Sequence, residues 1–568
     1  MSGTPQDDAG SVRSQDLPFR NLAADQPFPR QTQLFVLLML VSIGLRLWLL
    51  IVSRHYLRSD EAVVAMEALD IMEGGPIPFF LYRQAYGGGH TVEALLAIPW
   101  FSAFGPSDYL FKLGPALLSC VYVAVVYVCL YQFFNKRYAL IAATLFSLFA
   151  PFLAFNFLNN GGGVATLFGW VGLYFFLRAY FTESQNLGSA LLAGGALGFA
   201  YYCFDYALYF LAAVLTLWIV KDNIRLWRQW KAVLALLVGF VIGASPLIYY
   251  NLTHDFENIK YVFARAARPD PHPVLGALGR FARLLGHDLP AFFSLNVEDF
   301  PSEISLISYF SYGLFLIAVF YAAVKMKPAF FSMARAFFTR RTHLWSPGER
   351  IVYVLLLLLL DLGIYSLASA AESRPRYLII LCPLIPLVVA WAGYDLGRRH
   401  LIPGAIFTVL FGALQIPFIF DFAKDKTVLE WDVRTHGDDV KTLAKFLLDE
   451  NLTTVVTPYE IKWKLMFESR RRIVCAAYLF GFDREQKYNL EVIRRVNNEG
   501  APLAFVFDKE YKLVKVQQRY NPKAGFDVSA LHDYLRQNRI AYRTTPVGED
   551  YIVYHGFSKR FPLAHPYR

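Results

Sequence analysis

The sequence predicts a polytopic α-helical membrane protein with about eleven transmembrane helices, followed by a soluble α/β domain. Of its 568 residues, 56% are hydrophobic, 17% are aromatic and only 18% are charged, a composition typical of integral membrane proteins. Charged residues and short alternating patterns return after about residue 426. We therefore expect three parts: a tail over 1–31, a membrane domain over 32–425 and an extracytoplasmic α/β domain over 426–568.

The net charge of +10 does not indicate a nucleic-acid partner, because most basic residues lie in short clusters between apolar runs. Lys and Arg in such places orient helices relative to the membrane. The five cysteines are scattered, mostly within apolar runs, and show no metal-ligand spacing. We interpret them as packing residues rather than a disulfide framework.

Apolar runs long enough to cross a bilayer begin after the polar residues 1–31, which we predict to form a disordered cytoplasmic tail without a cleaved signal peptide. A span needs about 20 residues. The predicted spans are 34–53, 110–134, 138–157, 162–180, 188–204, 206–220, 233–250, 304–324, 351–371, 377–396 and 402–420.

The basic clusters predict the orientation of these spans. With the N-terminus inside, four short loops rich in Lys and Arg lie on the cytoplasmic side, as the positive-inside rule requires. The first loop, 54–108, and the C-terminal part then lie outside. The loop 251–303 is also outer but carries several basic residues, which long loops tolerate. These residues are Lys260, Arg265, Arg268, Arg280 and Arg283.

The first outer loop contains two predicted helices that lie along the membrane surface. Ala62 to Met72 is amphipathic at helical spacing, and Thr91 to Phe104 is apolar but too short to span comfortably. Gly74-Gly75-Pro76 and Gly87-Gly88-Gly89 between them would let the backbone approach a ligand closely. A flexible hinge is the plainer interpretation of a glycine triplet.

Two adjacent carboxylates, Asp60 and Glu61, follow the first apolar run and are the strongest functional signal. A carboxylate near a bilayer is costly unless it faces water, a cation or a partner, so acids at such positions indicate function. The alternative is a solvated first turn, because Ser59, Asp60 and Glu61 all suit the start of a helix.

The C-terminal part alternates between helical and strand patterns, which predicts a small α/β sandwich. It has no nucleophile motif or glycine fingerprint, so we expect a supporting or acceptor-recruiting role rather than chemistry. The predicted helices are 438–450, 490–498 and 528–538, and the predicted strands are 453–457, 473–477, 503–507 and 551–554.

Four short motifs occur in order along the membrane domain. They are Asp60-Glu61, the helix end Phe104-Gly105, the run Lys112-Leu113-Gly114-Pro115-Ala116-Leu117, and Arg376-Tyr377-Leu378-Ile379-Ile380 followed by Pro383 and Pro386. The ordered set resembles the GT-C superfamily of membrane glycosyltransferases. It is most similar to the branch of protein O-mannosyltransferases, which use dolichyl-phosphate-mannose, and aminoarabinose transferases. The resemblance covers residues 34–420, and the C-terminal part is not diagnostic.

The resemblance implies a transferase that takes a monosaccharide from a polyprenyl-phosphate donor in the outer leaflet and inverts the anomeric carbon. Asp60 would be the general base that accepts the proton of the acceptor hydroxyl. Glu61 would position the acceptor or, together with Asp60, hold a divalent cation such as Mg or Mn. No other cofactor is implied, and the acceptor stays open among a lipid, a polysaccharide and a protein.

The leaving polyprenyl phosphate requires cations or hydrogen-bond donors nearby. The candidates are Arg376, Arg374, Arg83 and His90, with Arg376 first because it lies in the matching motif and a guanidinium suits phosphate oxygens. An interfacial anchor is the alternative for Arg376. His90 lacks the proline pair that follows the corresponding residue in relatives, so a satisfied interfacial histidine is equally consistent.

The candidates for substrate binding are Asn159, Asn160, Asp205 and Tyr377. Relatives often place an aspartate in the outer turn where this chain has the two asparagines. Asparagine binds sugar hydroxyls but cannot act as a base at neutral pH. Asp205, at the outer turn between the predicted spans 188–204 and 206–220, could supply a carboxylate or cap a helix.

Two other functions stay open. An oligosaccharyltransferase-like enzyme would move a glycan from a lipid pyrophosphate onto asparagine, although the C-terminal part has no Trp-Trp-Asp motif. A lipid or solute transporter would use internal acids and broken helices, although no inverted repeat is evident. The polar N-terminal tail and the lack of an organelle-retention signal favour a bacterial plasma membrane.

Overall fold

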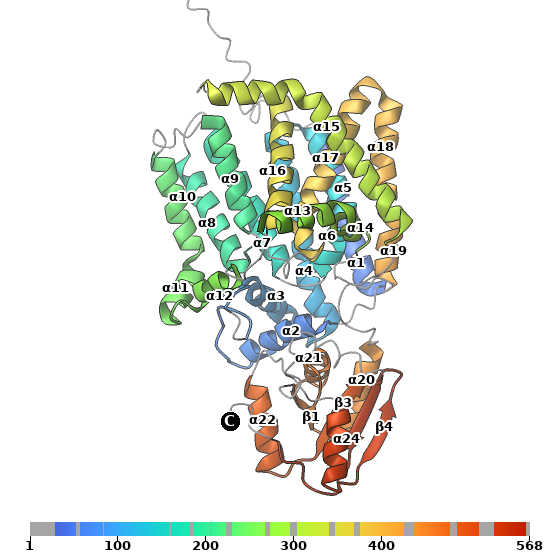
Figure 1. The fold of residues 1–568 in the computed structure, drawn as a ribbon. Coiled ribbons are helices and arrows are strands. Elements are labelled where there is room, and N and C mark those ends of the chain that lie inside the picture. The colour runs from blue at the N-terminus through green and yellow to red at the C-terminus, as the bar shows by residue number, and fades with distance from the viewer. Residues whose placement is uncertain are drawn as a thin grey trace, which may run out of the picture.

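The protein is described by a computed structural model that covers residues 29–52, 57–82, 85–157, 161–181, 186–205, 207–222, 230–266, 273–295, 304–339, 347–367, 375–424, 437–477, 486–509 and 528–563. Figure 1 shows a tall bundle of helices with a smaller α/β unit at one end. Helices α2 (Ser59–Met72) and α3 (Gly89–Phe104) lie between the bundle and the α/β unit.

Most of the chain forms the helical bundle. Its main elements are α1 (Pro29–Val52), α4 (Asp108–Phe133), α5 (Lys136–Leu148), α6 (Ala150–Phe157), α7 (Gly162–Phe181), α8 (Leu187–Cys203), α9 (Ala207–Asp222), α10 (Trp230–Gly243), α15 (Leu306–Phe338), α16 (Pro347–Leu367), α17 (Leu381–Arg399), α18 (Leu401–Ala413) and α19 (Ile416–Ala423). Shorter elements connect them: α11 (Ser245–Thr253), α12 (Glu257–Ala266), α13 (Pro273–Arg283), the π-helical turn η3 (Leu284–Asp288), α14 (Leu289–Phe293) and the 3₁₀ turn η5 (Pro375–Ile380).

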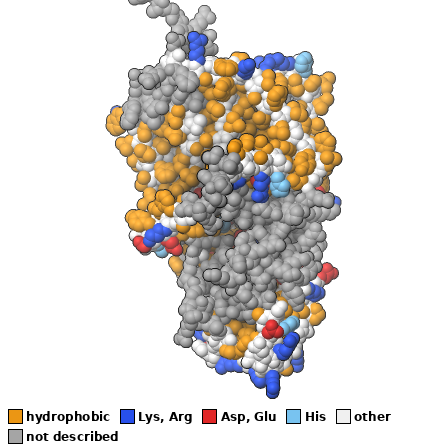
Figure 2. Space-filling view, viewed as in Figure 1, with side chains coloured by type: hydrophobic (Ala, Val, Ile, Leu, Met, Phe, Trp, Pro, Cys, Tyr) orange, Lys and Arg blue, Asp and Glu red, His pale blue; other side chains and the backbone are white. Residues whose placement is uncertain are grey.

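The bundle has the length and composition of an integral, multi-pass membrane protein. Within the described ranges, seven helices are long and apolar enough to cross a bilayer, or eight if the bent pair α10 and α11 is one span. Hydrophobic side chains cover the visible side of the bundle, and Lys, Arg and His gather at the end farther from the α/β unit (Figure 2).

The predicted count of about eleven spans is confirmed only in part. The predicted spans 188–204 and 206–220 form α8 and α9, whose apolar stretches are shorter than a full span. The predicted span 138–157 is divided at Phe149, which has an extended backbone between α5 and α6. Pro151 explains this break, because proline cannot donate to the carbonyl four residues earlier and its ring clashes with it.

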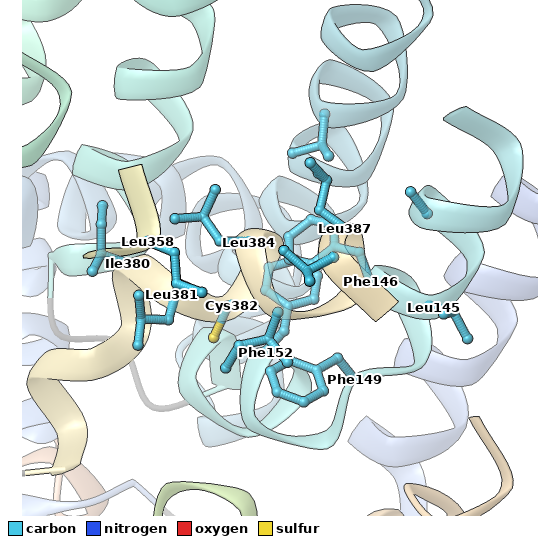
Figure 3. Packing of buried hydrophobic residues seen from close by; sticks show 14 of the residues in the cluster. Leu145, Phe146, Phe149, Phe152, Leu358, Ile380, Leu381, Cys382, Leu384 and Leu387 are labelled. Carbon is cyan, nitrogen blue, oxygen red and sulfur yellow. The ribbon is translucent and has the colours of Figure 1, made fainter. Parts of the chain in front are cut away.

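Aromatic packing fills the bundle around that break. Figure 3 shows Phe146, Phe149 and Phe152 next to the start of α17. The rings of Phe146 and Phe152 stack with centroids 3.9 Å apart. The Tyr138 hydroxyl donates to the carbonyl of Leu387 at 2.8 Å, which joins α5 to α17.

The α/β unit contains α20 (Gly437–Asp449), β1 (Thr454–Val456), α21 (Tyr459–Glu468), β2 (Val474–Ala476), α22 (Gln486–Asn497), β3 (Leu503–Asp508), α24 (Val528–Gln537), β4 (Arg543–Val547) and β5 (Tyr551–His555). The strand order is β2-β1-β3-β5-β4. Strand β1 pairs in parallel with β2 and β3, while β5 is antiparallel to β3 and β4. Each helix and strand predicted here forms, but α21 and β4 were not predicted.

Helix α2 shares a hydrophobic core with the α/β unit. Every residue from Glu61 to Leu69 is buried, and the cluster that contains them continues through α3, α20, α21 and the sheet. The prediction of an amphipathic surface helix was therefore wrong for α2, because α3 and α21 both pack against it. The predicted domain boundary between residues 425 and 426 falls within 425–436, which lie outside the described residues.

Charged groups fasten the α/β unit to α2. Asp70 forms ion pairs with Arg471 and Lys487 and accepts hydrogen bonds from the hydroxyls of Tyr82, at 2.5 Å, and Tyr488, at 3.3 Å. Arg471 also forms an ion pair with Glu73, the residue that follows α2.

The turn after α21 directs Arg471 toward α2. Arg470 and Arg471 have φ angles of +50° and +60°, a left-handed conformation that non-glycine residues adopt at a cost of order 1 kcal/mol each. The contacts of Arg471 with Asp70, Glu73 and the carbonyl of Met66, at 3.2 Å, offset this cost.

We expect Arg471→Ala to destabilise the protein by about 1–3 kcal/mol, because it removes a charged donor from the half-buried Asp70 and keeps the left-handed turn. Thermal unfolding in detergent measures the effect as a lower midpoint. The control is Arg494→Ala on α22, where an exposed arginine pairs with Glu491 and Glu499 and contributes little. Equal midpoints for the two variants would contradict the fastening role of Arg471.

Candidate active site

The two adjacent carboxylates at the start of α2 have different surroundings. Glu61 is buried, and the Lys112 ammonium lies 3.0 Å from both of its carboxylate oxygens. The Arg58 amide also donates to Glu61 Oε2 at 2.8 Å, so the Glu61 carboxylate satisfies the N-cap amide of α2. Glu61 is therefore committed to a buried ion pair that joins α2 to α4.

Asp60 is half-buried and contacts the α/β unit. The hydroxyl of Tyr459, the first residue of α21, donates to Asp60 Oδ1 at 2.8 Å. Next to it, the Ser59 hydroxyl donates to the carbonyl of Glu460 at 3.0 Å. The C-terminal part, for which the sequence predicts a supporting or acceptor-recruiting role, thus contacts Ser59 and Asp60 directly.

Sequence reasoning missed Tyr459 because it missed α21. This helix is buried on nearly every side, so its apolar residues show no one-sided period. The available signal was Pro458 directly before the run, because proline often precedes or opens a helix.

Two further acids, Glu67 on α2 and Glu93 on α3, were also missed. Glu67 accepts from the Thr91 hydroxyl at 3.1 Å, and Glu93 accepts from the Gly161 amide at 3.0 Å. In each, the second carboxylate oxygen is buried without a hydrogen-bond partner among the described residues. Burial raises the pKa of Glu67 and that of Glu93 to about 8. Acids inside otherwise apolar helical runs were the signal in the sequence.

The glycine triplet before α3 serves close packing rather than a hinge. A Cβ on Gly88 would overlap the ring of Tyr202, and a Cβ on Gly89 would overlap the backbone of Gly161. Gly87 has a φ of +78°, which favours glycine. The triplet therefore allows the start of α3 to contact the start of α7 directly.

His90 is buried at this contact. Its Nδ1 lies 2.9 Å from the carbonyl of Gly87, and its ring faces the ring of Phe204 edge-on, with centroids 6.5 Å apart. The His90 amide also lies beside Gly161. His90 and Glu93 thus both adjoin the residue that follows Asn159 and Asn160 in the chain.

Several predicted site residues cannot be placed in the same way. Arg83, Arg374, Asn159 and Asn160 lie outside the described residues, and for Arg376 only the backbone is described, in η5. Tyr377 is half-buried in the same turn. Asp205 is exposed at the break between α8 and α9, where its carbonyl accepts from the Leu208 amide at 3.0 Å.

The predicted residues therefore fall into separate groups. Asp60, Glu61 and His90 come together around α2 and α3. The turn η5 packs against α6, α14 and α17. Helix α6 ends at Phe157, four residues before the Gly161 that Glu93 holds, so residues 158–160 connect the two groups along the chain.

Two of the unexpected basic residues in the loop 251–303 have partners within the bundle. Arg283 Nε lies 3.2 Å from the buried Asp288, which also accepts from the Tyr365 hydroxyl at 2.9 Å. Arg280 donates to the carbonyl of Ser366 at 2.8 Å. These arginines satisfy buried acceptors, which explains their presence in a loop predicted to be outer.

Asp60 and Glu61 are also the candidate ligands of a divalent cation. Across the described ranges, no group of three or more His, Cys, Asp or Glu side chains is arranged to hold a metal ion. The Lys112 ammonium occupies the side of Glu61 where both of its oxygens point.

A sequence model of the dolichyl-phosphate-mannose-protein mannosyltransferase family matches residues 95–250. This region runs from α3 to α11 and includes Lys112 and Gly161. No curated protein matches the chain.

Solved structures give a longer match. ArnT from Cupriavidus metallidurans bound to undecaprenyl phosphate aligns with a TM-score of 0.58 and 12% identity, over 92% of this chain and 98% of that one. The archaeal oligosaccharyltransferase AglB from Archaeoglobus fulgidus, in complex with an inhibitory peptide and a dolichol-phosphate, aligns with a TM-score of 0.50 and 13% identity, over 87% of this chain and 72% of that one.

Identities this low show a common fold, and both of these proteins are GT-C glycosyltransferases. The resemblance expected from the ordered motifs is confirmed. The chain therefore shares the fold of GT-C membrane glycosyltransferases, and over residues 95–250 its sequence is similar to the dolichyl-phosphate-mannose-protein mannosyltransferase family.

Proposed function

We propose that the chain transfers one sugar from a polyprenyl-phosphate donor to an acceptor on the extracytoplasmic side of a bacterial plasma membrane, with inversion and with Asp60 as general base. The observation that carries this proposal is the division of roles between two neighbouring acids. Glu61 is fixed in a buried ion pair, whereas Asp60 keeps access to solvent. Its support also includes the polyprenyl phosphates in the ArnT and AglB structures.

The proposed reaction uses Asp60 because its carboxylate is half-buried and keeps access to solvent. Protonation of Glu61 would instead break a buried ion pair with Lys112, which costs about 3–5 kcal/mol. In the reaction, the acceptor oxygen bonds to the anomeric carbon while its proton moves to Asp60. The bond from that carbon to the donor phosphate breaks, and the electron pair leaves with the polyprenyl phosphate.

We assign the phosphate to the basic candidates of the sequence, with Arg376 first and Arg374, Arg83 and His90 beside it. A guanidinium can hold two phosphate oxygens at once and stabilise the charge that develops on them. His90 is the member of this set whose side chain is described, and it lies at the start of α3, which packs against α2.

We assign the sugar to Asn159 and Asn160, with Asp205 and Tyr377 as further contacts. Glu93 holds the adjacent Gly161 at 3.0 Å and lies close enough to Glu61 for the charge of Glu61 to raise the pKa of Glu93 further. Because Gly161 follows the two asparagines in the sequence, this proximity supports their assignment to the sugar.

We also propose that Asp60 and Glu61 can bind a divalent cation. In that case the Glu61 carboxylate would contact both the cation and the Lys112 ammonium. No step of the reaction above depends on such an ion. Activity that is unchanged by EDTA would remove the cation from the proposal.

We expect Asp60→Asn to abolish release of free polyprenyl phosphate, by roughly 10²-fold or more, because the amide keeps the shape of the side chain and cannot accept the proton. The assay uses the purified protein with a panel of polyprenyl-phosphate sugars. Asp533→Asn, an exposed residue of α24, is the matched control and retains activity.

A fully active Asp60→Asn variant would refute the assignment of the base. If only a lipid-pyrophosphate glycan is consumed, the oligosaccharyltransferase-like function is correct instead. Passage of intact donor across sealed vesicles would identify a transporter.

We expect Arg376→Ala to raise the KM for the donor about tenfold or more, because it removes a charge-assisted contact to phosphate. Steady-state kinetics at varied donor concentration measure this change. The comparison is Arg399→Ala at the exposed end of α17, which leaves donor use unchanged. The same KM in both variants would show that Arg376 is an interfacial anchor.

We expect stability to fall as pH rises from about 4.5 to about 8, because buried Glu93 stays protonated in the folded protein and ionises when unfolded. The raised pKa corresponds to at most roughly 5 kcal/mol. Glu93→Gln removes the share of this dependence that Glu93 contributes, while Glu67 keeps its own, and the variant increases the unfolding midpoint most above pH 8. The exposed Glu549→Gln is the control, and equal pH dependence in the two variants would contradict the burial of a neutral Glu93.

A further inference from the structure

Helices α2 and α21 lie side by side and run in the same direction. Their N-terminal ends meet where Ser59 contacts Glu460 and Asp60 contacts Tyr459. Toward their C-terminal ends, Arg471 contacts Asp70 and Glu73. Because the N-terminus of a helix carries a partial positive charge, this arrangement brings two such ends to the Asp60 carboxylate.

The Tyr459 side chain is held firmly. Tyr459 is buried, and its ring packs edge-on against Trp463 with centroids 6.4 Å apart. Trp463 is fully buried and stacks on Tyr82, with centroids 5.4 Å apart. The position of the Tyr459 hydroxyl is therefore set by aromatic packing that spans the α/β unit and the segment after α2.

A fixed donor on one carboxylate oxygen has two physical effects. It limits rotation of the carboxylate, so the lone pairs that remain keep one orientation. It also favours the ionised form of the acid, which is the form that accepts a proton.

We propose that Tyr459 is a positioning residue for Asp60, so that the α/β unit completes the catalytic centre of this chain. The inference rests on the function proposed above. It gives the C-terminal part a direct role in the reaction, in place of the supporting or acceptor-recruiting role expected from its sequence.

The interface offers a matched control for this role. The Tyr82 hydroxyl donates to Asp70 Oδ2 at 2.5 Å from a half-buried side chain at the same interface between α2 and the α/β unit. Tyr82→Phe and Tyr459→Phe therefore each remove one hydroxyl that binds a carboxylate of α2. Of the two, Tyr459→Phe is the one that removes a hydrogen bond to Asp60.

The experiment measures release of polyprenyl phosphate by the full-length protein as a function of pH and donor concentration. We expect Tyr459→Phe to lower kcat roughly 10- to 100-fold, as loss of a group that orients a reacting residue does. The donor KM stays the same, and the acid limb of the pH profile moves to higher pH. Tyr82→Phe keeps kcat within about twofold and leaves the acid limb in place.

Loss of stability in a variant is separated from loss of catalysis by measuring its folded fraction at each assay pH and expressing the rate per folded protein. An unchanged kcat and limb in Tyr459→Phe, or the same shift in Tyr82→Phe, would overturn the inference while Asp60-dependent release still supports the proposed function. Absence of Asp60-dependent release in the unsubstituted protein would overturn both.

Discussion

The buried ion pair between Glu61 and Lys112 is the contact on which the arrangement of this protein depends. A charged pair with almost no access to water is stable only when its geometry is good and its remaining lone pairs are satisfied. Here the ammonium lies 3.0 Å from both carboxylate oxygens, and the Arg58 amide supplies a further donor. The pair fixes the start of α2 against a helix long enough to cross the membrane, and it thereby fixes Asp60.

The same constraint explains why the α/β unit cannot be treated as an appendage. Once α2 is anchored to α4 by its first turn, its other faces are covered by α3 and α21. Its apolar residues then belong to the core of the α/β unit. Near the other end of α2, Asp70 also forms ion pairs, with Arg471 and Lys487 of the α/β unit. Both ends of α2 are therefore held by charged contacts.

The sequence was sufficient for features that depend on local pattern. The fold class, most helices and the strands β1, β2, β3 and β5 follow from hydrophobic period and turn residues. Features that depend on distant partners were not predictable. Helix α21 is buried on nearly every side, so its sequence lacks the alternation of polar and apolar faces that predicts a helix. Gly89 resembled part of a hinge because Gly161, which packs against it, is distant in the sequence. The role of Glu61 could not be separated from that of Asp60 until Lys112 was placed beside it.

The hydroxyl that contacts Asp60 lies 399 positions later in the chain. At a synthesis rate of about 5–20 residues per second, roughly 20–80 s separate the synthesis of the acid from that of its partner. During this interval both residues of the Glu61–Lys112 pair have been made, whereas the tyrosine whose hydroxyl contacts Asp60 has not. The contact between Asp60 and the α/β unit can therefore form only after the last helix of the bundle, α19, has been synthesised.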